Sequence, residues 1–228
     1  MLSTLGAMAA LPLLATFRTN ALAAENASLK IACSLAPQMT EGPYFVEERL
    51  NRSDLTSGAT SLGVVQGYPL LVGIDLVSIR GASCAPLAGV QVDVWHADAT
   101  GDYSDVGTQW GRKDLRGYQV SDAGGHVRFR SIYPGWYPGR TIHIHVKARR
   151  FDAVGNKTHE FNTQLFFDET TNDAVMAMTP YNARKPRDTT NAREGIEANS
   201  RLLVATSAST SGARGLIGTI TLGLDLPP

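Results

Sequence analysis

The chain lacks an excess of charge of either sign, because its 21 lysine and arginine residues are balanced by 21 aspartate and glutamate residues. Runs of basic residues are absent as well. Nucleic acid is therefore not an expected partner, since phosphate binding depends on clustered lysine and arginine. Internal repeats and low-complexity tracts are missing, which argues against a solenoid or a disordered tail. The 228 residues are 43% hydrophobic, enough to bury a proper core.

Long hydrophobic runs are scarce too. Leu2 to Phe17, at about 16 residues, is shorter than the roughly 20 that a transmembrane helix needs. The run is followed by Ala21-Leu22-Ala23, a small-x-small pattern that suits signal peptidase. We interpret residues 1–23 as an export signal and residues 24–228 as the mature domain, periplasmic or secreted and without a stable membrane anchor. A buried N-terminal helix is the alternative interpretation.

Cysteine is almost absent, with Cys33 and Cys84 as the two examples. An even number of cysteines in an exported chain favours a Cys33–Cys84 disulfide, which would stabilise the fold by about 4 kcal/mol in the chain-entropy model. Two unpaired buried thiols are the alternative. No CxxC motif or Cys/His cluster is present, so a structural zinc site is not expected.

From residue 69 onward, apolar and polar residues alternate in many short stretches, which are separated by glycine and proline turns. The expected strands cover residues 70–77, 89–95, 126–132, 141–147, 160–167 and 215–224. Only residues 173–178 look helical, and residues 24–68 look like an arm. The pattern predicts an all-β fold, a two-sheet β-sandwich core with an N-terminal wrapping arm and long active-site loops.

Two of the five histidines stand two residues apart in an expected strand, as His143-Ile144-His145. Side chains at positions i and i+2 project from the same face, so two imidazoles are presented side by side. Neutral imidazole suits zinc, copper, iron or nickel. Two metal ligands and two surface histidines remain equally good interpretations of this motif taken alone.

Tyr103 and Tyr137 are candidates for the remaining ligands, because both occur in turns near the ends of expected strands. A phenolate is a hard anionic ligand that favours a high-valent cation such as ferric iron. Spacing alone favours a simpler interpretation, in which each ring caps the end of the sandwich and each hydroxyl is wet.

Four segments of the chain stand out together. The two longer ones run from Gly89 to Ser104, which has Val94-Trp95-His96-Ala97-Asp98 at its centre, and from Asp122 to His145. The shorter ones are Thr40-Glu41-Gly42-Pro43-Tyr44 and Thr163-Gln164-Leu165-Phe166-Phe167. In this order they resemble the signature of the intradiol ring-cleavage dioxygenases, and most closely an exported, single-chain branch related to protocatechuate 3,4-dioxygenase and catechol 1,2-dioxygenase. Four motifs in the family's order are far more specific than any one of them.

The resemblance implies a single non-haem Fe(III) per chain, a catecholic substrate and O2, with a homo-oligomer left open. The aromatic ring would be cleaved between its two hydroxyl-bearing carbons to give a cis,cis-muconate-type diacid. Carried over position by position, the ferric ligands are Tyr103, Tyr137, His143 and His145. Tyr137 would also serve as a base for substrate protons. Arg140 matches the family's active-site arginine, and Gln164 matches a glutamine beside the substrate.

Departures from the family pattern lie between the second tyrosine and the histidines. Only six positions separate Tyr137 from His143, and Gly139 stands where better-known members often carry tryptophan. The site is therefore expected to be more open, with Tyr133 and Trp136 as its apolar wall. The preference for one catechol over another, protocatechuate in particular, does not carry over.

Two alternatives compete with this hypothesis. A non-enzymatic transthyretin-like β-sandwich binding module explains the strands and turns, but not the joint presence of the tyrosines and the histidine pair. A zinc or copper hydrolase would want carboxylate ligands, and the candidates are better explained as turn residues (Asp98, Asp102 and Asp105). The other histidines are expected to be structural or solvated (His96, His126 and His159).

Overall fold

The computed structural model describes residues 34–57, 64–81, 83–196, 202–208 and 215–226, all within the compact unit Cys33–Pro228. The predicted export signal lies outside the described residues. So does Cys33, whereas Cys84 is disulfide-bonded. In the part of the chain that is described, no helix combines the length and the apolar character that crossing a membrane requires.

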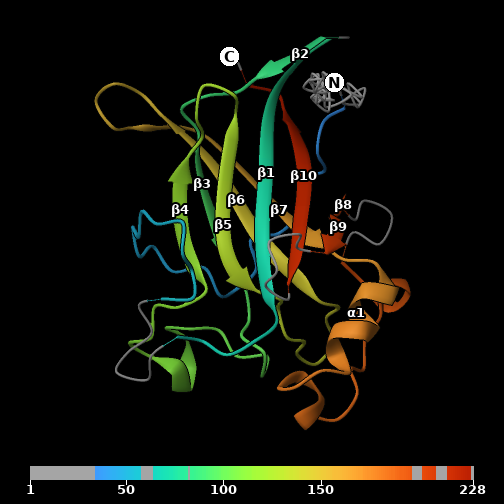
Figure 1. The fold of residues 1–228 in the computed structure, drawn as a ribbon. Helices are drawn as coiled ribbons and strands as arrows, with labels where there is room; N and C mark the ends of the chain where they lie inside the picture. The colour runs from blue at the N-terminus through green and yellow to red at the C-terminus, as the bar shows by residue number, and fades with distance from the viewer. Residues whose placement is uncertain (1–33, 58–63, 82, 197–201, 209–214, 227–228) are drawn as a thin grey trace, which may run out of the picture. The chain divides into compact units, whose positions relative to one another are not determined.

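The fold consists of two packed sheets, as predicted, and each has five strands within the described residues (Figure 1). The first sheet comprises β2 (Ser83–Pro86), β1 (Pro69–Arg80), β10 (Leu216–Leu224) and β9 (Ala205–Ala208) in that order, with β5 (His126–Ile132) paired to β1. The second has the order β4 (Arg116–Val120), β3 (Gln91–Trp95), β6 (His143–Phe151), β7 (Lys157–Phe166) and β8 (Leu202–Leu203). β10 lies parallel to β1, and the pairs within β3, β4, β6 and β7 are antiparallel.

The core lies between the sheets and follows from the alternation seen in the sequence. From β5, Val127 and Phe129 face inward and their neighbours face solvent. On β6, Ile144 and Val146 are fully buried in the same cluster, which leaves His143 and His145 on the opposite face of the strand. Burial of the apolar face thus forces both imidazoles to the other side of the sheet.

Phe129 gives a direct test of this core. We expect Phe129→Ala to lower the free energy of unfolding by about 3–5 kcal/mol, because the 1% exposed ring leaves a cavity between the sheets. Urea unfolding with the disulfide intact measures the change. Phe151→Ala is the matched control, since that ring is 40% exposed and its loss should cost well under half as much.

The outer face of the second sheet is covered by the N-terminal arm, residues 34–57. Met39 donates its backbone N–H to Asn162 on β7 at 2.8 Å. Lys147 on β6 pairs with Glu41, and its ammonium lies 3.4 Å from the centroid of the Phe45 ring. The arm therefore wraps the sandwich as predicted, and it makes the histidine-bearing face of β6 a buried one.

Helical structure differs in detail from the sequence prediction. The helix α1 (Glu169–Met176) begins earlier than the predicted residues 173–178, because Asp168 caps it by accepting the N–H of Thr171. Three short 3₁₀ turns accompany it, η1 (Gly107–Gln109), η2 (Tyr181–Ala183) and η3 (Asn191–Arg193). β6 also starts two residues later than predicted and runs on to Phe151.

Candidate metal centre

The first two groups of the site are the imidazoles at the beginning of β6. His143 and His145 are 2% and 0% exposed, and their Nε2 atoms lie 3.1 Å apart. Trp95 of β3, directly opposite His145 in the strand pairing, stacks parallel to its ring at a centroid distance of 4.8 Å. Strand alternation and this flat contact together aim both Nε2 atoms at one point.

Two phenols approach the same point from loops. The hydroxyl oxygen of Tyr137, in the loop before β6, lies 3.1 Å from Nε2 of His143. The hydroxyl oxygen of Tyr103, in the loop after β3, lies 3.4 Å from the same nitrogen. Four potential donor atoms therefore converge, although the residues that carry them lie up to 42 positions apart in the sequence, from 103 to 145.

The protonation of His143 leaves a lone pair aimed into this cluster. Its Nδ1 lies 2.7 Å from the carbonyl oxygen of Thr141 and donates its proton there, so Nε2 is an acceptor. Burial, with the Arg140 charge, lowers the pKa of His143 to about 3, and burial also lowers that of His145. Both rings are neutral, the form in which imidazole binds metal.

The residues present fit a bound metal ion. Atoms that each lie about 2.1 Å from a common ion, at angles between 90° and tetrahedral, are about 3.0–3.4 Å from one another, as the contacts around His143 are. No group of three His, Cys, Asp or Glu side chains suited to a metal occurs in the described ranges. Any metal here would therefore depend on phenol oxygen, a donor that suits a hard, high-valent cation.

Gly42 of the arm packs directly against the ring of His145. Its φ of +75° is one that glycine adopts readily, and a Cβ there would lie 3.0 Å from Cε1 of the imidazole. The next residues bring Tyr44 onto the cluster, with its ring stacked on Tyr103 at 4.5 Å between centroids. The segment Thr40–Tyr44 thus packs directly on the donor groups.

Arg140 lies beside the cluster and is held by three groups. Its Nε donates to both carboxylate oxygens of Glu194 at 3.0 Å, and Nη2 donates to Oε1 of Gln164 at 2.5 Å. Nη1 lies 3.4 Å from the Tyr137 hydroxyl. Gln164 sits opposite His145 in the strand pairing and donates its amide to the carbonyl of Thr40. The guanidinium is thus fixed beside the phenol oxygen.

Comparison with known proteins shows which family this chain belongs to. A family model described as "Dioxygenase" matches residues 40–183, more than half of the chain. The solved structure of an intradiol ring-cleavage dioxygenase from Tetranychus urticae is 31% identical, with a TM-score of 0.69 over 84% of this chain and 94% of that one. This chain belongs to the intradiol ring-cleavage dioxygenase family. The fold and the resemblance expected from the sequence are thereby confirmed.

Curated relatives from bacteria are similar over shorter stretches. The chlorocatechol 1,2-dioxygenase of Pseudomonas sp. (strain P51) is 30% identical over 150 residues, 56% of this chain and 54% of that protein. The hydroxyquinol 1,2-dioxygenase of Rhodococcus opacus is 32% identical over 97 residues, 42% of this chain and 30% of that protein. The chain thus spans about half or less of the length of these relatives.

Glu194 belongs to the site of this intradiol dioxygenase-family chain, but the sequence did not predict it. Glu194 is 2% exposed, and besides Arg140 it accepts the backbone N–H of Thr141 at 2.9 Å and that of Ile196 at 3.2 Å. It lies beyond the region that the family model matches, in a segment with no strand pattern. Only the folded return of residues 189–196 brings it beneath Arg140, and no local signal marks it.

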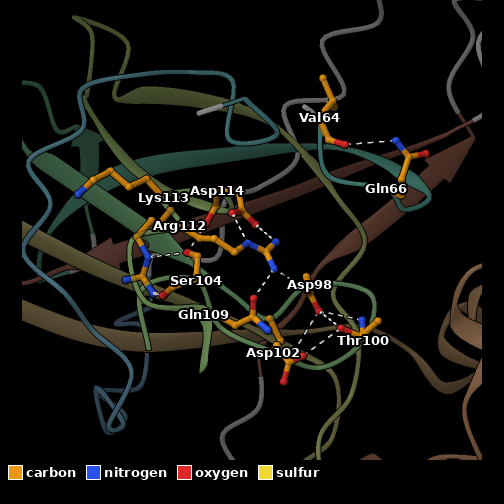
Figure 2. A network of polar contacts seen from close by, with 12 residues as sticks. Val64, Gln66, Asp98, Thr100, Asp102, Ser104, Gln109, Arg112, Lys113 and Asp114 are labelled. Carbon is orange, nitrogen blue, oxygen red and sulfur yellow. Dashed lines mark hydrogen bonds and ion pairs between the residues drawn. The ribbon is translucent and has the colours of Figure 1, made fainter. Parts of the chain in front are cut away.

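The loop that carries Tyr103 is built on a network of polar contacts (Figure 2). Asp98 accepts the N–H groups of Thr100 and Asp102 at 2.8 and 3.1 Å, which confirms its interpretation as a turn residue. Arg112 grips the Asp114 carboxylate at 2.9 and 2.7 Å and donates to Gln109 at 2.7 Å. These contacts hold the turn from both ends and fix where Tyr103 enters the cluster.

The apolar wall predicted from Tyr133 and Trp136 was wrong. Tyr133 is fully buried in the sandwich core, against Phe167, and its hydroxyl donates to Asn172 at 2.7 Å. Trp136 is 2% exposed and covered by the guanidinium of Arg184. Both point into the protein because the Pro134–Gly135 turn packs on the backbone of the 98–99 segment.

The remaining histidines take structural or surface positions. His96 is buried and hydrogen-bonded through Nδ1 to the Ala97 carbonyl and through Nε2 to the Ser131 hydroxyl, and burial lowers its pKa to about 4. His126 is exposed beside Asp75, and His159 is exposed on β7. His96 lies near enough to the four-donor cluster to affect the pKa of His143 and of His145, but both of its ring nitrogens are engaged elsewhere.

Proposed function

We propose that the protein is a non-haem Fe(III) dioxygenase that cleaves a catechol-type diol with O2 between its two hydroxyl-bearing carbons. The product would be a cis,cis-muconate-type diacid. The observation that carries the proposal is the convergence of two imidazole nitrogens and two phenol oxygens at 3.1–3.4 Å. That convergence occurs in a chain of the intradiol family, and the names of its relatives, chlorocatechol 1,2-dioxygenase and hydroxyquinol 1,2-dioxygenase, indicate catechol-type substrates.

Ferric iron suits this donor set, with Tyr103, Tyr137, His143 and His145 as its ligands. Two phenolates would offset two of its three positive charges, and two neutral imidazoles complete a mixed oxygen and nitrogen set. When bound, the iron supplies a Lewis acid that holds the diol and withdraws electron density from its ring.

The two tyrosines differ in a way that supports separate roles. Tyr103 is 5% exposed and stacked under Tyr44, whereas Tyr137 is only partly buried and lies within reach of Arg140. We assign to the Tyr137 oxygen the acceptance of a proton from the incoming diol. Arg140, always charged, would stabilise negative charge that develops beside it, and Gln164 would hold Arg140 in place.

The transthyretin-like binding module is not supported by any specific observation. A spacer or carrier sandwich has no need to bury two imidazoles and a phenol around one point, where each polar group costs free energy unless it is partnered. His145 Nδ1 is such a group, since it is buried and finds no hydrogen-bond partner among the described residues.

Product analysis tests the proposed reaction. The iron-loaded protein should consume one O2 per molecule of catechol and release a muconate-type diacid, detected by ultraviolet absorption and mass spectrometry. Hydroxyquinol and protocatechuate (3,4-dihydroxybenzoate) are assayed in the same way. Release of a semialdehyde, which arises when the ring opens beside the diol, or the absence of oxygen uptake with every catechol would contradict the proposal.

Glu194 offers a test of how Arg140 is held. We expect Glu194→Gln to lower kcat for catechol about tenfold with KM changed less than threefold, because the guanidinium loses its charged anchor while the substrate's iron site is untouched. Glu160→Gln is the control, because it removes another ion-paired carboxylate, one that pairs with Lys157 on β7 and does not contact Arg140. An unchanged kcat in a variant with wild-type urea stability would contradict this role.

We also propose that the protein works outside the cytoplasm. The disulfide-bonded state of Cys84 supports this, because disulfides persist in oxidising compartments. Expression of the full chain followed by cell fractionation tests it. The processed protein should be found in the periplasm or medium with no free thiol, and an unprocessed cytosolic protein would contradict the proposal.

A further inference from the structure

A cavity of about 370 Å³ opens beside the two tyrosines of the site. Tyr44, Tyr103, Tyr137 and Pro138 form one part of its wall, and the loop residues 101–109 form much of the rest. Its volume lies within the roughly 300–1,000 Å³ typical of small-molecule sites. A diol bound between the phenols would place its ring substituents toward this space, so its lining decides which substituents are accepted.

The charge of that lining is of one sign. Asp102, next to Tyr103 in the chain, is the charged residue among those that line the cavity, and no lysine or arginine lines it. Within the described part of the chain, no cation lies within ion-pair distance of the Asp102 carboxylate, which accepts only the Thr100 hydroxyl at 3.2 Å (Figure 2). The cavity thus presents a negative charge without an ion-pair partner, and Arg112, whose charge interacts with it at longer range, is itself paired with Asp98 and Asp114.

Among the described residues, three arginines near the cavity are engaged by other groups. Arg112, behind the cavity residue Gln109, is held by Asp114 and Asp98. Arg184, behind Gly101, donates to the Trp136 carbonyl at 2.6 Å and lies over that ring. Arg140 on the other side of the site is already paired with Glu194. A substrate carboxylate would therefore find no free positive partner.

We propose that Asp102 makes this cleft select catechols by the charge of the ring substituent. Catechols with a neutral or ammonium-bearing side chain are accepted, and those with a carboxylate are disfavoured. The proposal rests on the proposed ring-cleavage function and narrows its substrate class. A partly exposed charge acts through a high effective dielectric, so each charged substrate should differ from a neutral one by about three- to tenfold.

The experiment compares three substrates of the iron-loaded protein: catechol, 3,4-dihydroxybenzoate and 3,4-dihydroxyphenethylamine. Values of kcat/KM come from oxygen uptake at low and at high salt, and binding alone comes from anaerobic titrations of the visible absorption. We expect the amine to be favoured over the carboxylate about tenfold or more at low salt. Added salt should shrink this ratio, because it screens exposed charges.

Asp102→Asn should reduce the amine-to-carboxylate ratio about tenfold, and Asp102→Lys should invert it. Asp225→Asn, which removes an exposed carboxylate paired with Arg80 just after β10, should leave it unchanged. A wild-type ratio near one, or a ratio that Asp102→Asn does not alter, overturns the charge selection while leaving ring cleavage intact. No oxygen uptake with any of the three substrates overturns the proposed function instead. If a variant fails to fold, the wild-type protein alone tests the charge selection, because a ratio that added salt does not shrink would contradict it.

Discussion

Replacing His145 with alanine is expected to abolish iron binding and to lower oxygen uptake with catechol at least 1,000-fold. The side chain is 0% exposed and its Nε2 lies 3.1 Å from that of His143. Without it the site keeps one imidazole and two phenols, too few donors to retain the ion after dialysis. Metal analysis of the dialysed protein and an oxygen electrode give the two readings.

His159→Ala is the matched control for this loss, because His159 is an exposed histidine on the neighbouring strand β7. It should keep full iron content and activity. Urea unfolding of the metal-free proteins separates loss of metal from loss of fold, and His145→Ala should remain folded since the Nδ1 it removes has no hydrogen-bond partner. Full iron content in His145→Ala would contradict the assigned ligand set.

Arg140→Met is expected to lower kcat about 100- to 1,000-fold while iron stays bound, the effect typical of removing one group that stabilises developing charge. The single change also strands the Glu194 carboxylate, which is 2% exposed. Loss of one partner of such a buried pair costs about 3–5 kcal/mol of stability. Arg140→Met is therefore best combined with Glu194→Gln. The kcat of the double variant is measured by stopped-flow oxygen uptake.

The double variant separates chemistry from folding. It should match the wild type in iron content and visible absorption and still show the fall in kcat. Arg130→Met, which changes an exposed arginine on β5, should have no effect on either. A double variant that turns over catechol within threefold of wild type would show that Arg140 takes no part in the reaction.

Much of the fold was predictable because strand alternation is a local signal. Val127 and Phe129 mark β5 at its observed bounds, and the alternation through Ile144 fixes the face on which the histidines lie. β4 was missed because Gly117 interrupts its pattern and the pairing with β3, which completes it, is a long-range contact. α1 begins before its predicted start because the cap at Asp168 sets its first turn, whereas the apolar residues mark only its second half.

The site residues, like the strands, were predictable where the signal is local and not where it depends on long-range contacts. Residues within the family's motifs could be named from the sequence, and the structure brings Tyr103, Tyr137 and the histidine pair together. Glu194 could not be named, because only the chain's return beneath Arg140 gives it a role. Trp136 was wrongly predicted to line the site, because the sequence of a turn does not show whether an aromatic side chain in it points into the core or toward the site.

Iron content combined with visible absorption tests the central claim most directly. The purified protein should hold one ferric ion per chain and be coloured, because phenolate bound to ferric iron absorbs visible light. Tyr103→Phe and Tyr137→Phe should each shift or weaken the band, and the double variant should be colourless. Another metal in the site, or a band that survives the loss of both phenols, would contradict the account.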